Sequence, residues 1–380
     1  MKLAIKKILV LSYYHLWIAG GGHRPHQLLV EDLGLFRQII FVCASDTDIE
    51  NVSKWYANDI YKNLSLYVLS GNCLRCLKPF SENENNSFSS LEELTVTFKP
   101  DYIRAHNPVD LYLGYLEFIN KKNIPFIYDQ MDYWEAFSVQ PWGDKYVEEQ
   151  YIQSATHITT ISQYLINLLP KEKPKLLLEN AISNQFIQRI DESKHEKVIN
   201  NNSKNVLYIG AIWPSWFDWD LSIYLVRKFP KYNFTFIGAV TSTIDENDGV
   251  DTVKLAEELG SHSNVTMLPE ILHTDLAQWL IKSDVGIIPF KVNELTLACS
   301  PLKVFEYLAA GLPVVSPNLT QITGYPQVYT GNNFDEIAQS LAKAHKQNIA
   351  EKDKADMDKF RQSNTWQRRL NALDYFIGAL

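Results

Sequence analysis

Cysteine is scarce in this chain of 380 residues, which contains only four. They are scattered over positions 43, 73, 76 and 299, so there is no disulfide framework and a reducing cytoplasm is the expected compartment. Cys73 and Cys76 form a lone Cys-x-x-Cys pair without the further ligands that a zinc site needs. We therefore expect neither a disulfide scaffold nor a bound metal from these residues.

Long hydrophobic runs are also missing. No uninterrupted apolar stretch approaches the roughly 18 residues that a membrane-spanning helix needs. The charged start, residues 1–7, is similar to that of a signal peptide, but the apolar run Ile8–Leu11 is too short and fits a buried strand better. The expected location is the cytoplasm, and a peripheral contact with the inner face of the cell membrane stays open.

Positive charge is in deficit, with 36 Lys and Arg against 44 Asp and Glu, a formal net charge of −8. This balance argues against nucleic acid as a partner. The composition, 46% hydrophobic and 21% charged, is ordinary for a soluble globular protein. A chain of this length favours two domains over one.

Short apolar runs alternate with amphipathic segments along most of the chain. This alternation predicts an α/β fold with two parallel sheets, each covered by helices on both faces. The predicted strands lie at 8–14, 38–43, 102–105, 125–128, 156–160 and 176–178 in the first half, and at 206–209, 234–237, 265–268, 285–288 and 314–315 in the second.

A change of composition marks the expected boundary between the two halves. Residues 187–204 are rich in Asn, Lys, Glu and Ser and have little apolar periodicity, which is typical of a linker. We therefore predict an N-terminal domain over 1–186, a C-terminal domain over 205–362 and a final helix over 363–380. Each domain is expected to be Rossmann-like, with ligands beyond the carboxyl ends of its strands.

The most informative stretch is Ser300–Val315, where a loop with a serine and a lysine enters an amphipathic helix. The stop signals are Gly311 and, just beyond it, a proline. Ser300, Lys303 and Glu306 fall three apart, on one side of the first turn. A helix N-terminus attracts phosphate, a lysine adds charge for a diphosphate, and a carboxylate accepts hydrogen bonds from a ribose. The pattern predicts a nucleotide-diphosphate clamp; the alternative is a solvated helix face with a weak ion pair.

Polar residues that follow predicted strands in the first half are candidates for catalysis. Asp129 and Asp132 follow one strand, and we expect one of them, with Asp132 favoured, to act as a base. The alternative is that they cap the next turn. His106 follows another strand and is either a contact to the donor sugar or a structural histidine.

Two further motifs carry weaker signals. The loop Gly20–Gly22 precedes a helix, so the backbone of Gly21 and Gly22 could approach a phosphate; a plain flexible loop is the alternative. Arg24 in the first turn of that helix opposes the helix dipole, which favours a role facing a ligand. Asp218-Trp219-Asp220 has the spacing of a metal motif, but Asp218 is explained more simply as a helix N-cap.

Taken together, these residues resemble a glycosyltransferase of the GT-B fold, and are most similar to the GT4-type (group 1) enzymes of bacterial surface polysaccharides. The resemblance spans nearly the whole chain. It is carried by Tyr208–Ile212 with Trp216–Asp218, Leu268–Ile271 with Asp284–Phe290, Ser300–Val315, and Arg24–Gln27 with Tyr128–Asp132.

The resemblance implies two Rossmann-like domains facing a central cleft, with the donor bound mainly by the second. Glu306 would bind the donor ribose and Lys303 the diphosphate. The segment Trp366–Leu380 would cross back onto the first domain. The other residues implied in donor binding are Ser300, Pro301 and Leu302 near the phosphates, Pro269 and Ile271 at the base, and Gly210, Gly21, Gly22 and Arg24.

The implied reaction moves a sugar from a nucleotide-diphosphate donor, UDP first and GDP second, to a hydroxyl of a glycan or lipid-linked acceptor in cell-surface polysaccharide or glycoconjugate synthesis. No cofactor or metal is expected, because a helix dipole and a lysine hold the diphosphate. Ala298 stands where retaining members commonly carry a glutamate, so the stereochemistry stays open. Inversion would use Asp132 or Asp129 as base; retention would use His106 and the phosphates. A nucleotide-sugar epimerase and a non-catalytic partner protein are the alternatives.

Overall fold

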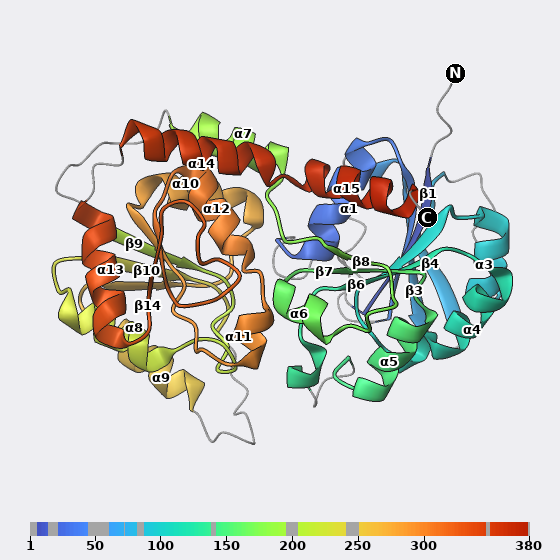
Figure 1. The fold of residues 1–380 in the computed structure, drawn as a ribbon, viewed down its shortest axis with the longest axis horizontal. Helices are drawn as coiled ribbons and strands as arrows, with labels where there is room; N and C mark the ends of the chain where they lie inside the picture. Colours follow the sequence, from blue (N-terminus) through green and yellow to red (C-terminus); the bar gives the residue numbers. More distant parts are fainter. Residues whose placement is uncertain are drawn as a thin grey trace. The chain divides into compact units, whose positions relative to one another are not determined.

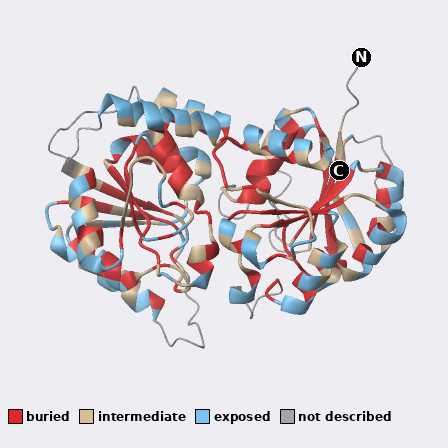
Figure 2. Cartoon of the chain, in the orientation of Figure 1, coloured by how far each residue is buried: buried red, intermediate tan, exposed pale blue. Residues whose placement is uncertain are grey.

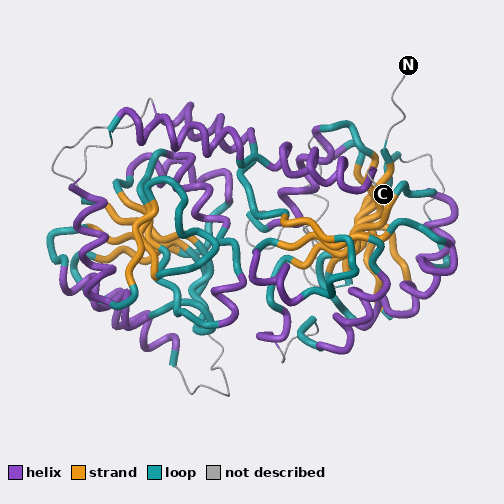
Figure 3. Tube along the Cα trace, viewed as in Figure 1, coloured by secondary structure: helices purple, strands orange, loops and turns teal. Residues whose placement is uncertain are grey.

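The structure is a computed structural model. It describes residues 6–13, 22–44, 61–71, 73–81, 87–137, 142–194, 204–240, 251–346 and 350–378. The chain divides into two compact units, the first made of Met1–Glu179 with Leu370–Leu380 and the second of Asn180–Arg369. Each unit is a sheet flanked by helices, as Figures 1 and 3 show.

The first unit contains an eight-stranded sheet with the spatial order β4-β3-β2-β1-β5-β6-β7-β8. All neighbours are parallel except β3 and β4, which are antiparallel. The expectation of a purely parallel sheet is therefore wrong at this edge. The strands are β1 (Lys7–Ser12), β2 (Gln38–Cys43), β3 (Leu64–Ser70), β4 (Cys73–Lys78), β5 (Tyr102–Ala105), β6 (Phe126–Gln130), β7 (His157–Thr160) and β8 (Lys175–Leu177).

Helices cover both faces of this sheet (Figure 1). On one face lies α1 (Arg24–Gly34), and on the other lie α3 (Leu91–Phe98), α4 (Leu113–Lys122) and α5 (Lys145–Ser154). Several of these helices begin at an N-cap residue whose side chain accepts a hydrogen bond from a first-turn amide. Ser90 caps α3, Asp144 caps α5, and Ser162 caps α6 (Gln163–Leu168).

The second unit contains a six-stranded parallel sheet in the order β11-β10-β9-β12-β13-β14. Its strands are β9 (Asn205–Ile209), β10 (Asn233–Ile237), β11 (Val265–Leu268), β12 (Val285–Ile287), β13 (Val314–Pro317) and β14 (Val328–Gly331). The helices are α7 (Asn184–Ser193), α8 (Trp219–Lys228), α9 (Thr252–Gly260), α10 (Leu276–Lys282), α11 (Glu294–Ala298), α12 (Leu302–Ala310), α13 (Phe334–Lys346), α14 (Glu351–Ser363) and α15 (Trp366–Gly378), the last shared with the first unit. Figure 1 shows α7, α10, α12 and α14 on one face of this sheet and α8, α9 and α13 on the other.

The central strands of both sheets are buried (Figure 2), as expected for sheets covered on two faces, whereas the edge strands β4, β8, β11 and β14 are mostly only partly buried. In the second unit, α12 packs very closely on the sheet. A Cβ at Gly286 of β12 would lie 2.4 Å from the ring of Tyr307, and the Tyr307 hydroxyl accepts a hydrogen bond from the Ile209 amide at 2.9 Å. These contacts hold α12 against β9 and β12.

The linker expected at 187–204 begins as helix instead. α7 continues to Ser193, and its buried Phe186 and Ile190 belong to the core of the second unit. Two apolar residues four apart suffice to dock one face of a helix that is otherwise polar, which is why composition alone suggested a linker. The division between the compact units falls between Glu179 and Asn180.

The last helix, α15, is shared between the units, with residues from Leu370 onward in the first. There the Asp374 carboxylate accepts hydrogen bonds from Lys6 Nζ at 2.7 Å and from Arg37. Within the residues that the structure describes, no helix has both the length and the apolar character needed to cross a bilayer.

Candidate functional site

The second unit gathers candidate residues where its strand order reverses. From β9 the chain builds one side of the sheet through β10 and β11, and the other side through β12, β13 and β14. The carboxyl ends of β9 and β12 therefore flank the switch point, the usual ligand position in open α/β sheets. Gly210 directly follows β9, and Phe290 follows β12 by a few residues.

Lys303, in the first turn of α12, reaches this switch point. Its Nζ lies 4.5 Å from the ring centroids of both Tyr208 and Phe290, and 3.4 Å from the Tyr208 hydroxyl. Both rings present their faces to the amine, an arrangement that stabilises a cation. Burial lowers the pKa of Lys303 to about 8, against the opposing influence of Cys299 and Glu306. The amine is therefore a partly desolvated charge without an ion-pair partner among the described residues.

The backbone of Gly210 faces the same amine. Its φ of +127° belongs to a region that side chains disfavour, and a Cβ there would lie 2.8 Å from Lys303 Nζ. The Tyr208 hydroxyl donates to the Ala211 carbonyl at 2.8 Å, and Trp216 Nε1 donates to the same oxygen at 3.0 Å. The loop after β9 is thus fixed with only backbone toward the amine.

The start of α12 has no side-chain cap. Pro301 stands at the N-cap, where its ring fixes φ near the helical value but supplies no acceptor for the first amides. The Asn180 amide donates to Ser300 Oγ at 3.4 Å, so this hydroxyl faces Asn180. The predicted helix stop is confirmed, since Gly311 adopts φ +81°. Leu302 opens the helix, and its first turn is available for an anion.

Glu306 lies one turn further along α12 and is buried beside a histidine. His273 Nε2 lies 2.6 Å from Glu306 Oε1, and the His273 ring stacks on Phe186 with centroids 4.3 Å apart. His273 was not singled out from the sequence, because nothing local to it signals a partner 33 residues away. Pro269 is exposed and Ile271 half-buried, both in the loop after β11 at the carboxyl edge of the sheet.

In the first unit the switch point lies between β1 and β5, and a buried cluster stands at the ends of β5 and β6. Arg24 Nε and Nη2 donate to the two Asp129 oxygens at 2.8 Å each, and His106 Nδ1 lies 2.9 Å from Asp129 Oδ2. Thr159 Oγ1 donates to Asp129 Oδ1 at 2.6 Å. The guanidinium charge that opposes the dipole of α1 is thus balanced by Asp129.

These contacts set the protonation of the cluster. Burial alone would raise the pKa of Asp129, but the charge and hydrogen bonds of Arg24 and the hydrogen bond from His106 hold it well below its usual range. Burial lowers the pKa of His106, against the influence of Asp129. A neutral His106 that donates from Nδ1 carries its lone pair on Nε2, and that buried nitrogen has no hydrogen-bond partner among the described residues.

Asp132 behaves differently from Asp129. It is half-buried, two residues beyond β6, and makes no hydrogen bond or ion pair with any residue that the structure describes. Burial raises the pKa of Asp132 to about 7, with Arg24 opposing. Of the two carboxyl groups, Asp132 is therefore the one able to exchange a proton near neutral pH. Gly22 lies two residues before α1, and Gly21 lies outside the described residues.

A second buried carboxyl lies on the opposite face of the same sheet. Glu148 of α5 accepts hydrogen bonds at Oε1 from the Tyr128 hydroxyl and from Gln130 Nε2, both at 2.8 Å. Burial raises the pKa of Glu148. Sequence reasoning missed it, because a glutamate in the first turn of a helix is ordinary.

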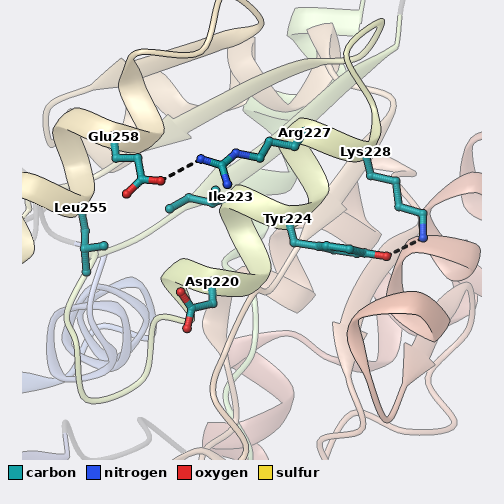
Figure 4. Close-up of a pocket in the computed structure, with 7 residues that line it drawn as sticks. All are labelled: Asp220, Ile223, Tyr224, Arg227, Lys228, Leu255 and Glu258. Atoms are coloured by element: carbon teal, nitrogen blue, oxygen red, sulfur yellow. Dashed lines mark hydrogen bonds and ion pairs between the residues drawn. The ribbon is translucent and has the colours of Figure 1, made fainter.

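A cavity of about 440 Å³ lies elsewhere on the second unit, between α8 and α9 (Figure 4). Its charged side chains pair locally, with Arg227 Nη2 donating to Glu258 at 2.9 Å and Lys228 donating to the Tyr224 hydroxyl. None of the residues predicted to bind the donor lines this cavity.

Asp218 caps α8 through the Leu221 amide, so its predicted role as an N-cap is confirmed. Within the described ranges, no three His, Cys, Asp or Glu side chains converge as metal ligands.

Comparison with known families finds a similarity in the second unit. Residues 203–347 match the family described as glycosyl transferases group 1. This segment is thus similar to the group 1 glycosyltransferases, over less than half of the chain. The matched segment contains every donor-side candidate of the second unit, from Gly210 to Glu306, whereas Arg24, His106, Asp129 and Asp132 lie outside it.

One relative and two solved structures extend the comparison. The teichuronic acid biosynthesis glycosyltransferase TuaH of Bacillus subtilis (strain 168) is 26% identical over 197 residues, which span 49% of this chain and 46% of that protein. Anabaena HepE in complex with UDP and glucose superposes with a TM-score of 0.68 at 13% identity, covering 99% of this chain and 100% of that one. Sucrose-phosphate synthase from Thermosynechococcus elongatus gives 0.62 at 11% identity, with 98% of each chain covered. At these identities the superpositions show the fold alone: the chain has the GT-B fold, as the sequence resemblance predicts.

Proposed function

We propose that this glycosyltransferase moves a sugar from a UDP-linked donor to a hydroxyl of a glycan or lipid-linked acceptor in cell-surface polysaccharide synthesis. The observation that carries the proposal is the partly desolvated Lys303 amine at the switch point, facing the Gly210 backbone. UDP as the nucleotide is supported by the UDP complex of the similar HepE structure. The polysaccharide context is supported by the teichuronic acid role in the name of the relative.

In this proposal the diphosphate binds at the start of α12. The first-turn amides from Leu302 onward and the Lys303 charge stabilise the negative charge that develops as the bond to the sugar breaks. Gly210 allows a phosphate oxygen to approach the amine closely, because no side chain stands there. Glu306 accepts hydrogen bonds from the ribose, and the loop of Pro269 and Ile271 borders the base. No metal is then required for departure of the nucleotide.

The first unit supplies the chemistry at the sugar and the acceptor. When the acceptor oxygen forms its bond to the anomeric carbon, the bond from that carbon to the phosphate oxygen breaks and UDP leaves with the electron pair. The hydroxyl proton passes to a base. With inversion, Asp132 takes that proton; with retention, His106 Nε2 accepts a hydrogen bond from a sugar hydroxyl, and a phosphate oxygen takes the proton. Asp129 holds the His106 ring in place. A lipid-linked acceptor would bring the protein to the inner face of the cell membrane.

Thermal unfolding with UDP, GDP, ADP and TDP tests the donor class, because a ligand that binds only the folded protein raises the midpoint. We expect UDP to give the largest rise and Glu306→Ala to lose it. Equal shifts with all four nucleotides, or none, would contradict the proposal. Incubation with UDP-sugar alone separates the alternatives: an epimerase converts the sugar, a glycosyltransferase slowly transfers it to water and releases UDP, and a non-catalytic partner protein leaves the UDP-sugar intact.

A further inference from the structure

His273 is a polar side chain in the second unit to which the proposed reaction gives no role. Its Nε2 lies 2.6 Å from Glu306 Oε1, and the two side chains are only 13% and 9% exposed. A charge-assisted contact this short and this shielded from water is strong compared with a surface ion pair. The pair therefore restricts where the Glu306 carboxylate can lie.

The histidine is itself held in place. It begins the short 3-10 turn His273–Asp275 that leads into α10, and its ring stacks on Phe186 of α7 at an interplanar angle of 28°. Phe186 is a core residue, 2% exposed, at the start of a helix capped by Ser183. Three elements distant in sequence, α7, the 3-10 turn and α12, thus converge on one carboxylate.

This arrangement leaves one carboxylate oxygen for a ligand. Oε1 is engaged by His273, whereas Oε2 has no hydrogen-bond partner in the part of the chain that the structure describes. A carboxylate fixed in one plane can accept from two neighbouring hydroxyls at once, using Oε2 and the remaining lone pair of Oε1. A carboxylate free to rotate would lose that geometry and with it part of the binding free energy.

We propose that His273 is a positioning residue that orients Glu306 toward the 2′,3′-diol of the donor ribose, and that the pair makes the donor site select ribonucleotides over 2′-deoxyribonucleotides. The inference rests on the proposed function, since it takes Glu306 as the ribose-binding residue. A merely structural pair would join α12 to the turn before α10 without affecting this selectivity.

Isothermal titration calorimetry with UDP and 2′-deoxy-UDP tests the inference on three proteins: wild type, His273→Asn and His273→Gln. A glutamine amide places its N–H near the position of histidine Nε2, whereas an asparagine amide reaches only as far as Nδ1. The two variants therefore differ in whether a donor reaches Glu306. Thermal unfolding without nucleotide shows that each variant is folded.

We expect wild type to bind UDP about tenfold more tightly than 2′-deoxy-UDP, because losing the 2′-hydroxyl leaves part of a buried carboxylate unsatisfied. In His273→Asn this ratio falls to near one, mainly through weaker UDP binding, and His273→Gln restores most of it. A folded His273→Asn variant that keeps the wild-type ratio would overturn the inference while leaving the proposed function intact. Wild type that binds neither nucleotide would overturn both.

Discussion

A Cβ atom at Gly210 would lie 2.8 Å from Nζ of Lys303, so the backbone of one residue and the amine of the other face each other directly. The glycine follows β9, and the lysine, 93 residues later, lies in the first turn of α12. Their juxtaposition at the switch point of the second sheet is the geometric basis for placing the donor diphosphate there.

The first prediction concerns that contact. Gly210→Ala places a methyl group against the amine and forces alanine to φ +127°, so we expect UDP binding to fall at least about tenfold and stability to fall by roughly 1–2 kcal/mol. Gly324→Ala is the matched control, because Gly324 has φ +96° but open space around it. The control should lose stability and keep its UDP affinity, both measurable by calorimetry. Equal UDP affinity in Gly210→Ala and Gly324→Ala would show that Gly210 does not belong to the UDP site.

The second prediction follows from the lowered pKa of Lys303. With a pKa of about 8, the amine is mostly charged at pH 7 and mostly neutral at pH 9. Diphosphate binding needs the charged form, so UDP affinity should fall about tenfold between these pH values. Lys303→Arg keeps its charge throughout and should give a flat profile over the same range. A wild-type affinity that is constant from pH 7 to 9 would contradict the assignment of the amine to the diphosphate.

The third prediction concerns stability of the first unit. Asp129→Ala leaves the buried Arg24 charge without its partner, and the loss should be about 3–5 kcal/mol by urea denaturation. Because the pKa of Asp129 is depressed on folding, its contribution is present above the pKa of the unfolded chain, near 4, and is lost as the pH falls through the folded value.

A paired variant provides the control for that prediction. Replacing both ends of the ion pair, as Arg24→Met with Asp129→Leu, removes the buried charges together and should cost much less than Asp129→Ala alone. Asp132→Asn, at a carboxyl without described partners, should leave stability nearly unchanged. Additive losses in the double variant would show that the pair is not coupled.

The fourth prediction separates the two candidate bases. If Asp132 takes the acceptor proton, kcat/KM should rise as the pH increases through about 7. The Asp132→Asn variant should lose this pH-dependent rise together with most of the activity. If His106 instead contacts the sugar, Asp132→Asn keeps the activity and His106→Ala loses it, with retention at the anomeric carbon. The anomeric configuration of the product, determined by NMR, checks the same assignment independently.

Much of the fold could be predicted from short-range pattern. Strands β2, β5 and β11 have the residue bounds expected from their apolar runs, because turn signals delimit each run on both sides. The antiparallel hairpin of β3 and β4 was missed, although Gly71, which adopts φ +56°, stands between the strands as a turn signal. Helix α7 was missed because its docking depends on two apolar residues and a tertiary partner surface.

The candidate site also contains residues that local sequence pattern predicts and contacts that it does not. Lys303 and Glu306 could be placed together from sequence, because helix periodicity relates residues three apart. The contacts of Arg24 with Asp129 and of His273 with Glu306 could not, because they join residues 105 and 33 positions apart. Such pairs depend on which helix packs over which strand end, and a single sequence does not encode that locally.

Calorimetric titration of UDP into wild type and Lys303→Met at pH 7 tests the central claim most directly. Methionine keeps the length and the contacts of the lysine stem with Tyr208 and Phe290 but removes the charge. We predict saturable one-site UDP binding to wild type and at least a tenfold weaker affinity in a variant that unfolds at a similar temperature. UDP binding of equal affinity in both proteins would contradict the assignment of the donor site to the start of α12.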